Sequence, residues 1–445
     1  MNLKAKPVVV VGLGKTGYSV VAFFAARNFD VVAMDTRDEP PFADQIKQNF
    51  PQVTLHLGGL NQETLLTAEQ VVVSPGLPLA TAEIKAAIDQ NIKVISDIQV
   101  FADYAEAPVI AITGSNAKST VTSLVGLMAQ EAGLNTAIGG NLGTPALDLI
   151  EDDVDLYVME LSSFQLDATP NLNPLAATVL NISPDHLDRY DSYKDYYLSK
   201  HVIFNGCKWG VVNLDDPLSA PQLSQPEQVV GFTLNTPKDN EFGIVASNER
   251  LFLAKGNELL LDCDLLKIKG SHNRSNALAA LALGEKAGIS MPSMLKTLQS
   301  FPGLEHRCQW VGQHGGVEFY NDSKGTNVGA TLAALEGLGP DIKGHLILMA
   351  GGVGKDADFS FLQEPVAKFV DTLVLYGQDK HAIENALTGK AEIMIAADFN
   401  DAFKKACAAS KNGDAVLLSP ACASFDMFKS FEHRGESFVK LVGAL

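Results

Sequence analysis

The sequence predicts an α/β protein with three domains, each built on a mostly parallel, doubly wound sheet. Short apolar runs typical of strands alternate with amphipathic helical stretches along the chain, which is the pattern of βα units. The chain also has 445 residues, more than one hydrophobic core usually supports. We therefore expect domains at residues 1–96, 97–303 and 304–445.

The first unit opens with the strand-like run VVVV and the turn GLGKTG, residues 12–17. These glycines have the G-x-G-x-x-G spacing of a dinucleotide-binding turn, and Asp35 ends the next strand-like run, so NAD is one interpretation. The same helix N-terminus can bind any diphosphate, and the glycines can also serve tight packing alone. Thr36 and Arg37 suit a nucleotide-sugar diphosphate equally well.

The second unit begins with VIAITGSNAKST, residues 109–120, which has the pattern of a strand, a turn and a helix start. The strict P-loop pattern G-x-x-x-x-G-K-[ST] fails, because Ile112 and Ala117 occupy its glycine positions. Lys118, Ser119 and the backbone N–H groups still suit a phosphate and a metal. If residue 117 needs a positive φ, alanine costs roughly 1–2 kcal/mol. We expect a working loop; an ordinary strand–turn–helix connection is the alternative.

Other polar residues of the second unit also follow strand-like runs. Glu160 ends DLYVME, where a P-loop enzyme holds Mg2+. Asp185, His186 and Asp188 lie in NISPDHLDRY, which could reach a second metal or be a solvated loop. Taken alone, Lys200 is expected at the surface. The segment from about 208 to 268 is expected to be a β-rich addition, and Asn273 and Asn276 in SHNRSNALAALAL could be helix caps.

The third unit offers cations beyond strand ends. Lys324 and Thr326 lie in NDSKGTN, and Lys355 lies in GGVGKD. Two lysines with nearby hydroxyls suit a dicarboxylate amino acid, although each lysine could be plain surface charge.

One regularity joins the three units. Because ligands of open α/β sheets bind beyond the carboxyl ends of the strands, three such edges suit an enzyme that joins two substrates with a nucleotide. The residues that follow apolar runs are Gly12, Asp35, Ser74, Gly114, Glu160, Asn181, Asp322, Gly351, Gly377 and Ser419.

Composition argues against a nucleic-acid-binding protein and against a membrane-spanning protein. The net charge of −18 argues against a nucleic-acid surface, and no apolar run reaches the ~18 residues that a membrane span needs. The five cysteines form no C-x-x-C pair, which fits reduced thiols. The strand-like run near the N-terminus leaves no room for a signal peptide, so we expect the cytoplasm.

Taken together, the motifs resemble the Mur ligase family over essentially the whole chain. Eight segments carry the resemblance in order: ITGSNAKST, MELSSFQL, LNISPDHLDRY, SHNRSNALAALAL, PGLEHR, NDSKGTN, GGVGKDADF and LLSPACASFDMF. It implies a Rossmann-like N-terminal domain, a P-loop ATPase-like central domain with the β-rich addition, and a Rossmann-like C-terminal domain. The implied enzyme is a monomer that uses ATP and Mg2+ to add D-glutamate to UDP-N-acetylmuramoyl-L-alanine through an acyl phosphate.

The resemblance also implies residue roles. The resemblance implies that the catalytic residues are Lys118, Glu160, His186 and Lys200. It implies that Mg2+ is bound by Ser119, Glu160, His186 and a carbamylated Lys200. ATP is bound by Gly114, Ser115, Asn116, Ala117, Lys118, Ser119, Thr120, Asn276, Arg307 and Asp322. The UDP-linked substrate is bound by Gly14, Lys15, Thr16, Asp35, Thr36, Arg37, Ser74, Gly76, Asn141, Ser162, Gln165 and His186. D-glutamate is bound by Lys324, Thr326, Lys355, Ser424 and Phe431.

The chain departs from the family pattern at Ala117, where a glycine is expected, and at Val353, where an acidic residue is expected. Lys15 and Phe425 also differ from their motifs. Three alternatives stay open: a sister ligase that adds another amino acid, an NAD-dependent oxidoreductase, and a regulatory protein whose nucleotide site is inactive through Ala117.

Overall fold

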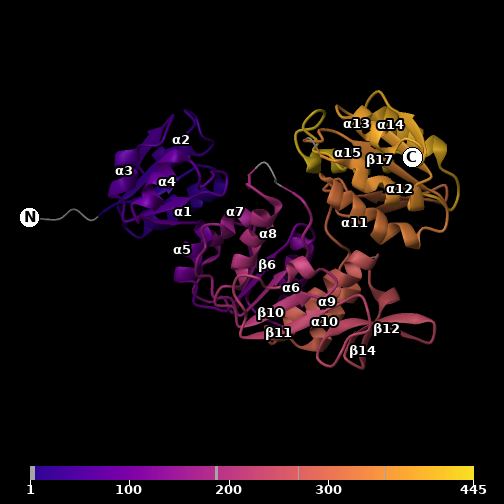
Figure 1. Cartoon of the computed structure of the whole chain (residues 1–445), viewed down its shortest axis with the longest axis horizontal. Helices are drawn as coiled ribbons and strands as arrows, with labels where there is room; N and C mark the ends of the chain where they lie inside the picture. Colours follow the sequence, from indigo (N-terminus) through magenta and orange to yellow (C-terminus); the bar gives the residue numbers. More distant parts are fainter. Residues whose placement is uncertain (1–5, 186–188, 269, 356) are drawn as a thin grey trace, which may run out of the picture.

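The computed structural model describes residues 6–185, 189–268, 270–355 and 357–445. These residues form three separate sheets that follow one another along the chain. In Figure 1 the indigo first unit and the orange-to-yellow third unit lie on either side of the magenta central unit. Helix α11 (Val328–Leu338) is the part of the third unit that packs on the central helix α9 (Ser271–Lys286).

The first sheet has five parallel strands in the order β3-β2-β1-β4-β5. Apolar clusters cover both of its faces, so the predicted doubly wound fold is confirmed. Its strands are β1 (Val8–Val11), β2 (Val31–Asp35), β3 (Thr54–Leu57), β4 (Gln70–Val73) and β5 (Lys93–Ile95). Its helices are α1 (Lys15–Ala26), α2 (Ala43–Asn49), α3 (Gln62–Thr67) and α4 (Ala82–Asp89), and α5 (Asp97–Tyr104) follows at the start of the unit expected at residues 97–303.

The turn between β1 and α1 needs two of its glycines for space. Gly12 has a φ of 92°, and a methyl group on Gly17 would overlap the Gly12 carbonyl oxygen. Gly14 differs, since a methyl group there would meet nothing within 4 Å. The packing interpretation therefore accounts for Gly12 and Gly17 and leaves Gly14 facing open space.

The central sheet has nine strands in the order β14-β13-β12-β11-β10-β9-β6-β8-β7. The strands from β7 to β12 are parallel, and β12, β13 and β14 form an antiparallel meander at one edge. The strands are β6 (Val109–Thr113), β7 (Thr136–Gly140), β8 (Leu156–Glu160), β9 (Ala176–Val179), β10 (Trp209–Asn213), β11 (Gln228–Phe232), β12 (Phe242–Ser247), β13 (Arg250–Lys255) and β14 (Glu258–Asp262). The expected β-rich segment is thus a continuation of the central sheet.

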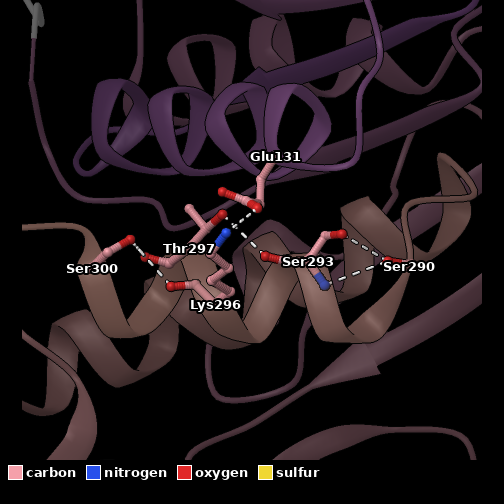
Figure 2. Close-up of polar contacts among 6 residues, drawn as sticks. All are labelled: Glu131, Ser290, Ser293, Lys296, Thr297 and Ser300. Atoms are coloured by element: carbon pink, nitrogen blue, oxygen red, sulfur yellow. Dashed lines mark hydrogen bonds and ion pairs between the residues drawn. The ribbon is translucent and has the colours of Figure 1, made fainter.

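Helices cover both faces of the central sheet. They are α6 (Lys118–Glu131), α7 (Ser163–Leu166), α8 (Tyr193–His201), α9 and α10 (Met291–Ser300). Phe101 of α5 packs edge to face on Tyr157 of β8 with ring centroids 5.0 Å apart. The apolar cluster that contains both rings also includes Val8 and Val10 of β1, so the first two units share one cluster. At the far end of α6, the Lys296 ammonium lies 2.6 Å from the Glu131 carboxylate and ties α10 to α6 (Figure 2).

The third sheet has six strands in the order β15-β16-β20-β17-β18-β19, parallel except for β15. Separate apolar clusters on its two faces again give a doubly wound unit. Its strands are β15 (Gln309–His314), β16 (Val317–Asn321), β17 (Leu346–Gly351), β18 (Thr372–Tyr376), β19 (Glu392–Ile395) and β20 (Ala415–Leu418). Its helices are α11, α12 (Gln363–Phe369), α13 (Lys380–Leu387), α14 (Phe399–Ala409) and α15 (Phe431–Val442).

Within the described ranges, no helix combines the length and apolar character that crossing a membrane requires.

The glycine turn of the first unit gives a first prediction. Gly17→Ala forces α1 away from β1, because the new methyl group overlaps the Gly12 carbonyl, and such overpacking costs typically 1–3 kcal/mol. Gly14→Ala places its methyl group in open space and should leave the fold intact. We expect a lower melting temperature for Gly17→Ala alone, measured by differential scanning calorimetry. Equal melting temperatures for both variants would contradict the packing argument.

Candidate active site at the carboxyl ends of the strands

The loop between β6 and α6 has the backbone of an anion-binding turn. Gly114 has a φ of 151°, and a methyl group on it would approach the Leu180 Cβ to 3.1 Å. Ala117 takes the left-handed conformation, with a φ of 65° and a ψ of −1°. Residue 117 therefore has the positive φ considered from the sequence, and alanine is strained there by roughly 1–2 kcal/mol. The first N–H groups of α6 follow this turn, and a helix leaves them without partners of its own.

Asn181, which follows β9, holds this loop in place. Its backbone oxygen accepts from the Ser115 N–H at 2.9 Å, and its Oδ1 accepts from the Asn116 N–H at 2.8 Å. The Ser115 hydroxyl lies 2.9 Å from the Tyr196 hydroxyl of α8. The loop is thus fixed from two sides before any ligand binds.

Two cations converge on the loop from different units. Lys118 Nζ donates to the backbone oxygens of Gly114 and Ser115 at 2.8 and 2.9 Å, and burial lowers the pKa of this lysine. Arg307, which lies ahead of β15 in the third unit, donates from Nη2 to the Ser119 hydroxyl at 2.8 Å. The third unit therefore reaches the phosphate loop directly.

Glu160 ends β8 beside the loop and is buried, with 3% of its surface exposed. Its Oε1 accepts from Asn141 Nδ2 at 2.7 Å, whereas its Oε2 is buried and has no hydrogen-bond partner among the described residues. An unpaired buried carboxylate oxygen is costly, and Mg2+ prefers such oxygen ligands. Glu160 and the Ser119 hydroxyl therefore fit a magnesium ion.

The second expected metal position is less completely described. In the part of the chain that the structure describes, no three His, Cys, Asp or Glu residues form a cluster that could hold a metal. His186 and Asp188 lie outside the described residues. Asp185 is described, and its Oδ2 accepts from Asn327 Nδ2 of the third unit at 3.3 Å.

The expectation of a surface lysine at position 200 is wrong. Lys200 lies on α8 with 2% of its surface exposed, and its Nζ is 4.7 Å from the centroid of the Tyr196 ring. Burial lowers its pKa well below the ordinary value, and the nearby Lys118 acts in the same direction. The spacing of four residues from Tyr196 to Lys200 places both on one face of the helix, which is the signal that could have located it.

The cap interpretation of Asn273 and Asn276 is also wrong. The N-cap of α9 is Gly270, and both asparagines are buried in the first two turns of the helix. Asn276 Nδ2 donates to Asn273 Oδ1 at 3.1 Å. Asn273 lines a cavity of about 50 Å³ together with Thr120 and Arg307, so the start of α9 faces the phosphate loop.

Asp322 follows β16 and is buried in the third unit. Its Oδ2 accepts from the Ser419 hydroxyl at 2.7 Å, and its Oδ1 accepts from the Cys308 N–H at 3.1 Å. Burial raises its pKa to about 6. Since Cys308 directly follows Arg307 in the chain, Asp322 fixes the segment from which Arg307 reaches the loop.

In the first unit, the Asp35 carboxylate is fully engaged. Its Oδ1 accepts from the backbone N–H and the Nε of Arg37, both at 2.9 Å. Its Oδ2 accepts from the Leu13 N–H and from Arg37 Nη2, both at 2.7 Å. A carboxylate has about four acceptor positions, so none is left for the ribose hydroxyl that an NAD-binding acid would hold.

Two of the other residues expected at the UDP-linked substrate, Lys15 and Gly76, make hydrogen bonds between the first two units. Lys15 Nζ donates to the Gly143 oxygen at 2.7 Å, across the junction. Ser74 donates to the Gly12 oxygen at 2.8 Å, and the Gly76 oxygen accepts from Arg189 Nη1 at 3.3 Å. Thr36 is exposed, and Thr16 is partly buried in α1.

Ser162 and Gln165 form a capping box at the start of α7. Gln165 Oε1 accepts from the Ser162 hydroxyl at 3.1 Å, and its Nε2 donates to Asp97 Oδ2 of α5 at 3.4 Å. These side chains are thus held two to five residues beyond Glu160, at the junction of the first two units.

Of the five residues expected at D-glutamate, the structure brings Lys324 and Phe431 into side-chain contact, and Thr326 lies close to Lys324 in the chain. Lys324 is half-buried, so the surface interpretation is wrong for it, and its Nζ lies 3.9 Å from the centroid of the Phe431 ring. The Thr326 N–H donates to the Lys324 oxygen at 2.7 Å. Ser424 is buried after β20, while Lys355 is exposed.

Comparison with known proteins decides the family. Three family models match in sequence order: "Mur ligase MurD-like, N-terminal domain" at residues 6–96, "Mur ligase middle domain" at 112–284 and "Mur ligase, glutamate ligase domain" at 306–422. The chain belongs to the Mur ligase family.

Curated relatives match this Mur ligase from end to end. The UDP-N-acetylmuramoylalanine--D-glutamate ligase of Pseudomonas savastanoi pv. phaseolicola is 52% identical over 98% of both chains. The proteins of that name from Pseudomonas aeruginosa and Hahella chejuensis are 50% and 47% identical, again over 98% of both chains.

Solved structures share the fold. A pseudomurein peptide ligase type C from Methanothermus fervidus has a TM-score of 0.61 at 18% identity, covering 98% of this chain and all of that one. UDP-N-acetylmuramate-alanine ligase MurC from Thermotoga maritima has a TM-score of 0.60 at 17% identity, covering 99% of this chain and all of that one.

Reasoning from the sequence missed Arg434 of α15, whose exposed fraction is 0%. It donates from Nε to the Ser323 hydroxyl at 2.9 Å, from Nη2 to the Ser323 oxygen at 2.8 Å and from Nη1 to the Cys422 oxygen at 3.1 Å. This arginine therefore holds the segments that carry Lys324 and Ser424. An arginine in an amphipathic helix gives no sequence signal of burial.

The structure accounts for one of two departures from the family pattern, Val353, and not for the other, Phe425. Val353 exchanges backbone hydrogen bonds with Ala423, both at 2.9 Å, so its backbone links the Lys355 loop to the Ser424 segment whatever its side chain. Phe425 is 70% exposed, and nothing in the structure explains it.

The strained turn at Ala117 gives a second prediction. Ala117→Gly removes a strain of roughly 1–2 kcal/mol and adds about 0.5–1 kcal/mol of chain entropy lost on folding. We expect the variant to stay active and to gain about 1 kcal/mol or less in stability, measured by urea unfolding. The KM for ATP should change by less than about tenfold. Loss of stability on this substitution would show that the left-handed turn carries no strain.

Proposed function

We propose that this Mur ligase adds D-glutamate to UDP-N-acetylmuramoyl-L-alanine, with ATP consumed through an acyl phosphate. This is a cytoplasmic step of peptidoglycan synthesis. The observation that carries the proposal is the meeting of Lys118, Ser119, Glu160 and Arg307 at one point, where Glu160 keeps a buried oxygen without a partner. The 52% identity to a relative that bears this enzyme's name supports the choice of amino acid.

ATP would bind along the loop and the start of α9. The N–H groups at the start of α6 and the Lys118 ammonium suit its phosphates. Asn273 and Asn276 lie at the start of α9, and Asn273 shares a cavity with Thr120 and Arg307, which supports an adenosine position there. Asp322 would hold the ribose from the third unit.

Ser119 and Glu160 would hold one Mg2+, and His186 with a carbamylated Lys200 would hold a second. Magnesium, when bound, neutralises phosphate charge and polarises the phosphoryl oxygens. Lys200 supports this assignment by its position, since it is buried beside Lys118 and its lowered pKa favours the neutral amine that reacts with CO2. The resulting carbamate is an anionic oxygen ligand, whereas an ammonium would repel the metal.

The first unit would bind the UDP portion rather than a dinucleotide. Gly14 faces open space at the N-terminus of α1, and Arg37 is exposed. Asp35, whose carboxylate has no free acceptor position, would act by holding Arg37 rather than by accepting a hydrogen bond from the substrate. Asn141 would bind substrate through atoms other than the amide nitrogen that it gives to Glu160. We also propose that the functional units are residues 1–96, 97–303 and 304–445.

The third unit would bind D-glutamate. Lys324 and Lys355 offer positive charge for its two carboxylates, with Thr326 and Ser424 as hydrogen-bonding groups. Phe431 lies under the Lys324 ammonium and keeps it in place. We propose a monomer, as the family resemblance implies.

The reaction follows in two steps. The alanine carboxylate of the UDP-linked substrate attacks the γ-phosphorus, which gives an acyl phosphate and ADP. Lys118 and Arg307 stabilise the charge of that transfer from fixed positions. The amine of D-glutamate then attacks the acyl carbon and loses a proton, and the tetrahedral intermediate collapses to the amide and inorganic phosphate.

Substrate dependence tests the proposal against a sister ligase. Purified protein with Mg-ATP and UDP-N-acetylmuramoyl-L-alanine should release phosphate when D-glutamate is added, and not with L-alanine, L-glutamate or meso-diaminopimelate. Mass spectrometry should show one glutamate added to the precursor. Phosphate release with another amino acid in place of D-glutamate would assign the chain to a sister activity, and no release at all would refute the ligase.

The role of Glu160 gives a matched test. Glu160→Gln keeps the shape but replaces a carboxylate oxygen by an amide, so we expect kcat to fall by at least about a hundredfold, as for loss of one charge-stabilising group. Glu131→Gln, at the opposite end of α6 (Figure 2), should keep the wild-type kcat. Circular dichroism checks that both variants fold. A Glu160→Gln variant with wild-type kcat would exclude this carboxylate from magnesium binding.

A further inference from the structure

Helices α9 and α11 approach each other so closely at the junction of the central and third units that only glycines fit. Gly270, the N-cap of α9, has a φ of 95°, and a methyl group on it would lie 2.6 Å from the Gly337 oxygen of α11. A methyl group on Gly337 would overlap the imidazole of His272. The two backbones and the imidazole are therefore in direct contact.

No hydrogen bond of the His272 Nδ1 atom explains why the ring packs against α11. The Nδ1 atom is buried and has no hydrogen-bond partner among the described residues, although the residue as a whole is partly exposed. Burial lowers the pKa of this histidine to about 4, and Arg274 adds to the effect. The ring is thus neutral near pH 7 and acts on α11 by its volume.

The contact lies between the two parts of the proposed site. His272 precedes Asn273, which lines the cavity beside Thr120 and Arg307. Helix α11 begins at Val328, directly after the segment of Lys324 and Thr326. A shift of α11 on α9 would therefore move the amino-acid side of the site relative to the phosphate loop.

Two other contacts between these units are hydrogen bonds between side chains. Arg307 donates to Ser119, and Asn327 donates to Asp185. Such bonds can re-form after a small shift. Overlap at Gly337 can be relieved only by moving the His272 ring, whose Nδ1 is buried, or the backbone of α11, because glycine has no side chain to rotate. The ring and Gly337 therefore set the limit of approach.

We propose that His272 is a positioning residue whose imidazole, seated against Gly337, sets the distance between the third unit and the phosphate loop during ligation. This inference rests on the proposed function for its kinetic effects. Its structural effect, a change in the placement of the third unit, does not.

The first test is Gly337→Ala, with Gly312→Ala as the matched control. A methyl group on Gly312 of β15 meets nothing closer than 3.8 Å, so the control should behave as wild type. We expect Gly337→Ala to lower kcat at least about tenfold and to raise the KM for D-glutamate. The KM for the UDP-linked substrate should stay within about twofold, because the first unit does not touch this junction. Wild-type kinetics of Gly337→Ala would overturn the proposal.

The second test is rescue. In the double variant His272→Ala and Gly337→Ala, the new methyl group enters the space that the ring has left. We expect kcat to return to within about threefold of the single variant His272→Ala. If the double variant is as impaired as Gly337→Ala, the overlap with His272 is not the cause, and the proposal fails.

A third measurement covers the case in which Gly337→Ala does not fold. His272→Ala removes the ring without adding a clash, so it should fold, with a KM for D-glutamate raised several-fold. Small-angle X-ray scattering should give a radius of gyration that differs from wild type. Unchanged scattering and unchanged KM would overturn the positioning role. Scattering also separates the two proposals, since an inactive wild type would refute the ligase and leave this comparison standing.

Discussion

The site depends on the hydrogen bond from Arg307 of the third unit to the Ser119 hydroxyl of the central unit. This bond brings a cation of the third unit onto the phosphate loop, beside the hydrogen bond of Asn327 with Asp185 and the packing of α11 on α9. Contacts within each unit position the donor and the acceptor of the Arg307–Ser119 hydrogen bond. The turn at Ala117 starts α6 with Ser119 as its second residue, buried beside the loop, and Asp322 holds the Cys308 N–H beside Arg307. A guanidinium at the hydroxyl that we propose as a magnesium ligand also places positive charge where a phosphoryl group would transfer.

This arrangement reconciles an acidic chain with anionic ligands. The net charge is −18, yet Lys118, Lys200 and Arg307 gather beside the loop. Burial lowers the pKa of both lysines, which means that the protein alone solvates these charges poorly. Phosphates and carboxylates would relieve that cost when they bind. The affinity for anions therefore comes from local burial rather than from overall charge.

The sequence predicted what depends on local patterns. Strand-end positions located Glu160 and Asp322, and the failed P-loop pattern still located a turn with a positive φ at Ala117. It could not predict what depends on tertiary packing. Lys200 is buried because α8 turns its Tyr196 face inward, and the Asp35 carboxylate is saturated because Arg37 folds back on it. The residues of the second metal position were chosen through the family resemblance, and their roles stay predictions.

The departures from the family pattern differ from the positions that must be glycine. At Ala117, where a glycine is expected, and at Val353, where an acidic residue is expected, the structure uses the backbone, through a left-handed turn and a pair of hydrogen bonds. A side chain there costs about the energy of its backbone strain or nothing, so substitution is tolerated. At Gly17 and Gly337 the structure requires that there is no side chain, because a backbone oxygen or an imidazole occupies the space that a side chain would need. Steric overlap rises far more steeply than conformational strain, so these positions control how close helix and strand, or one unit and the next, can come.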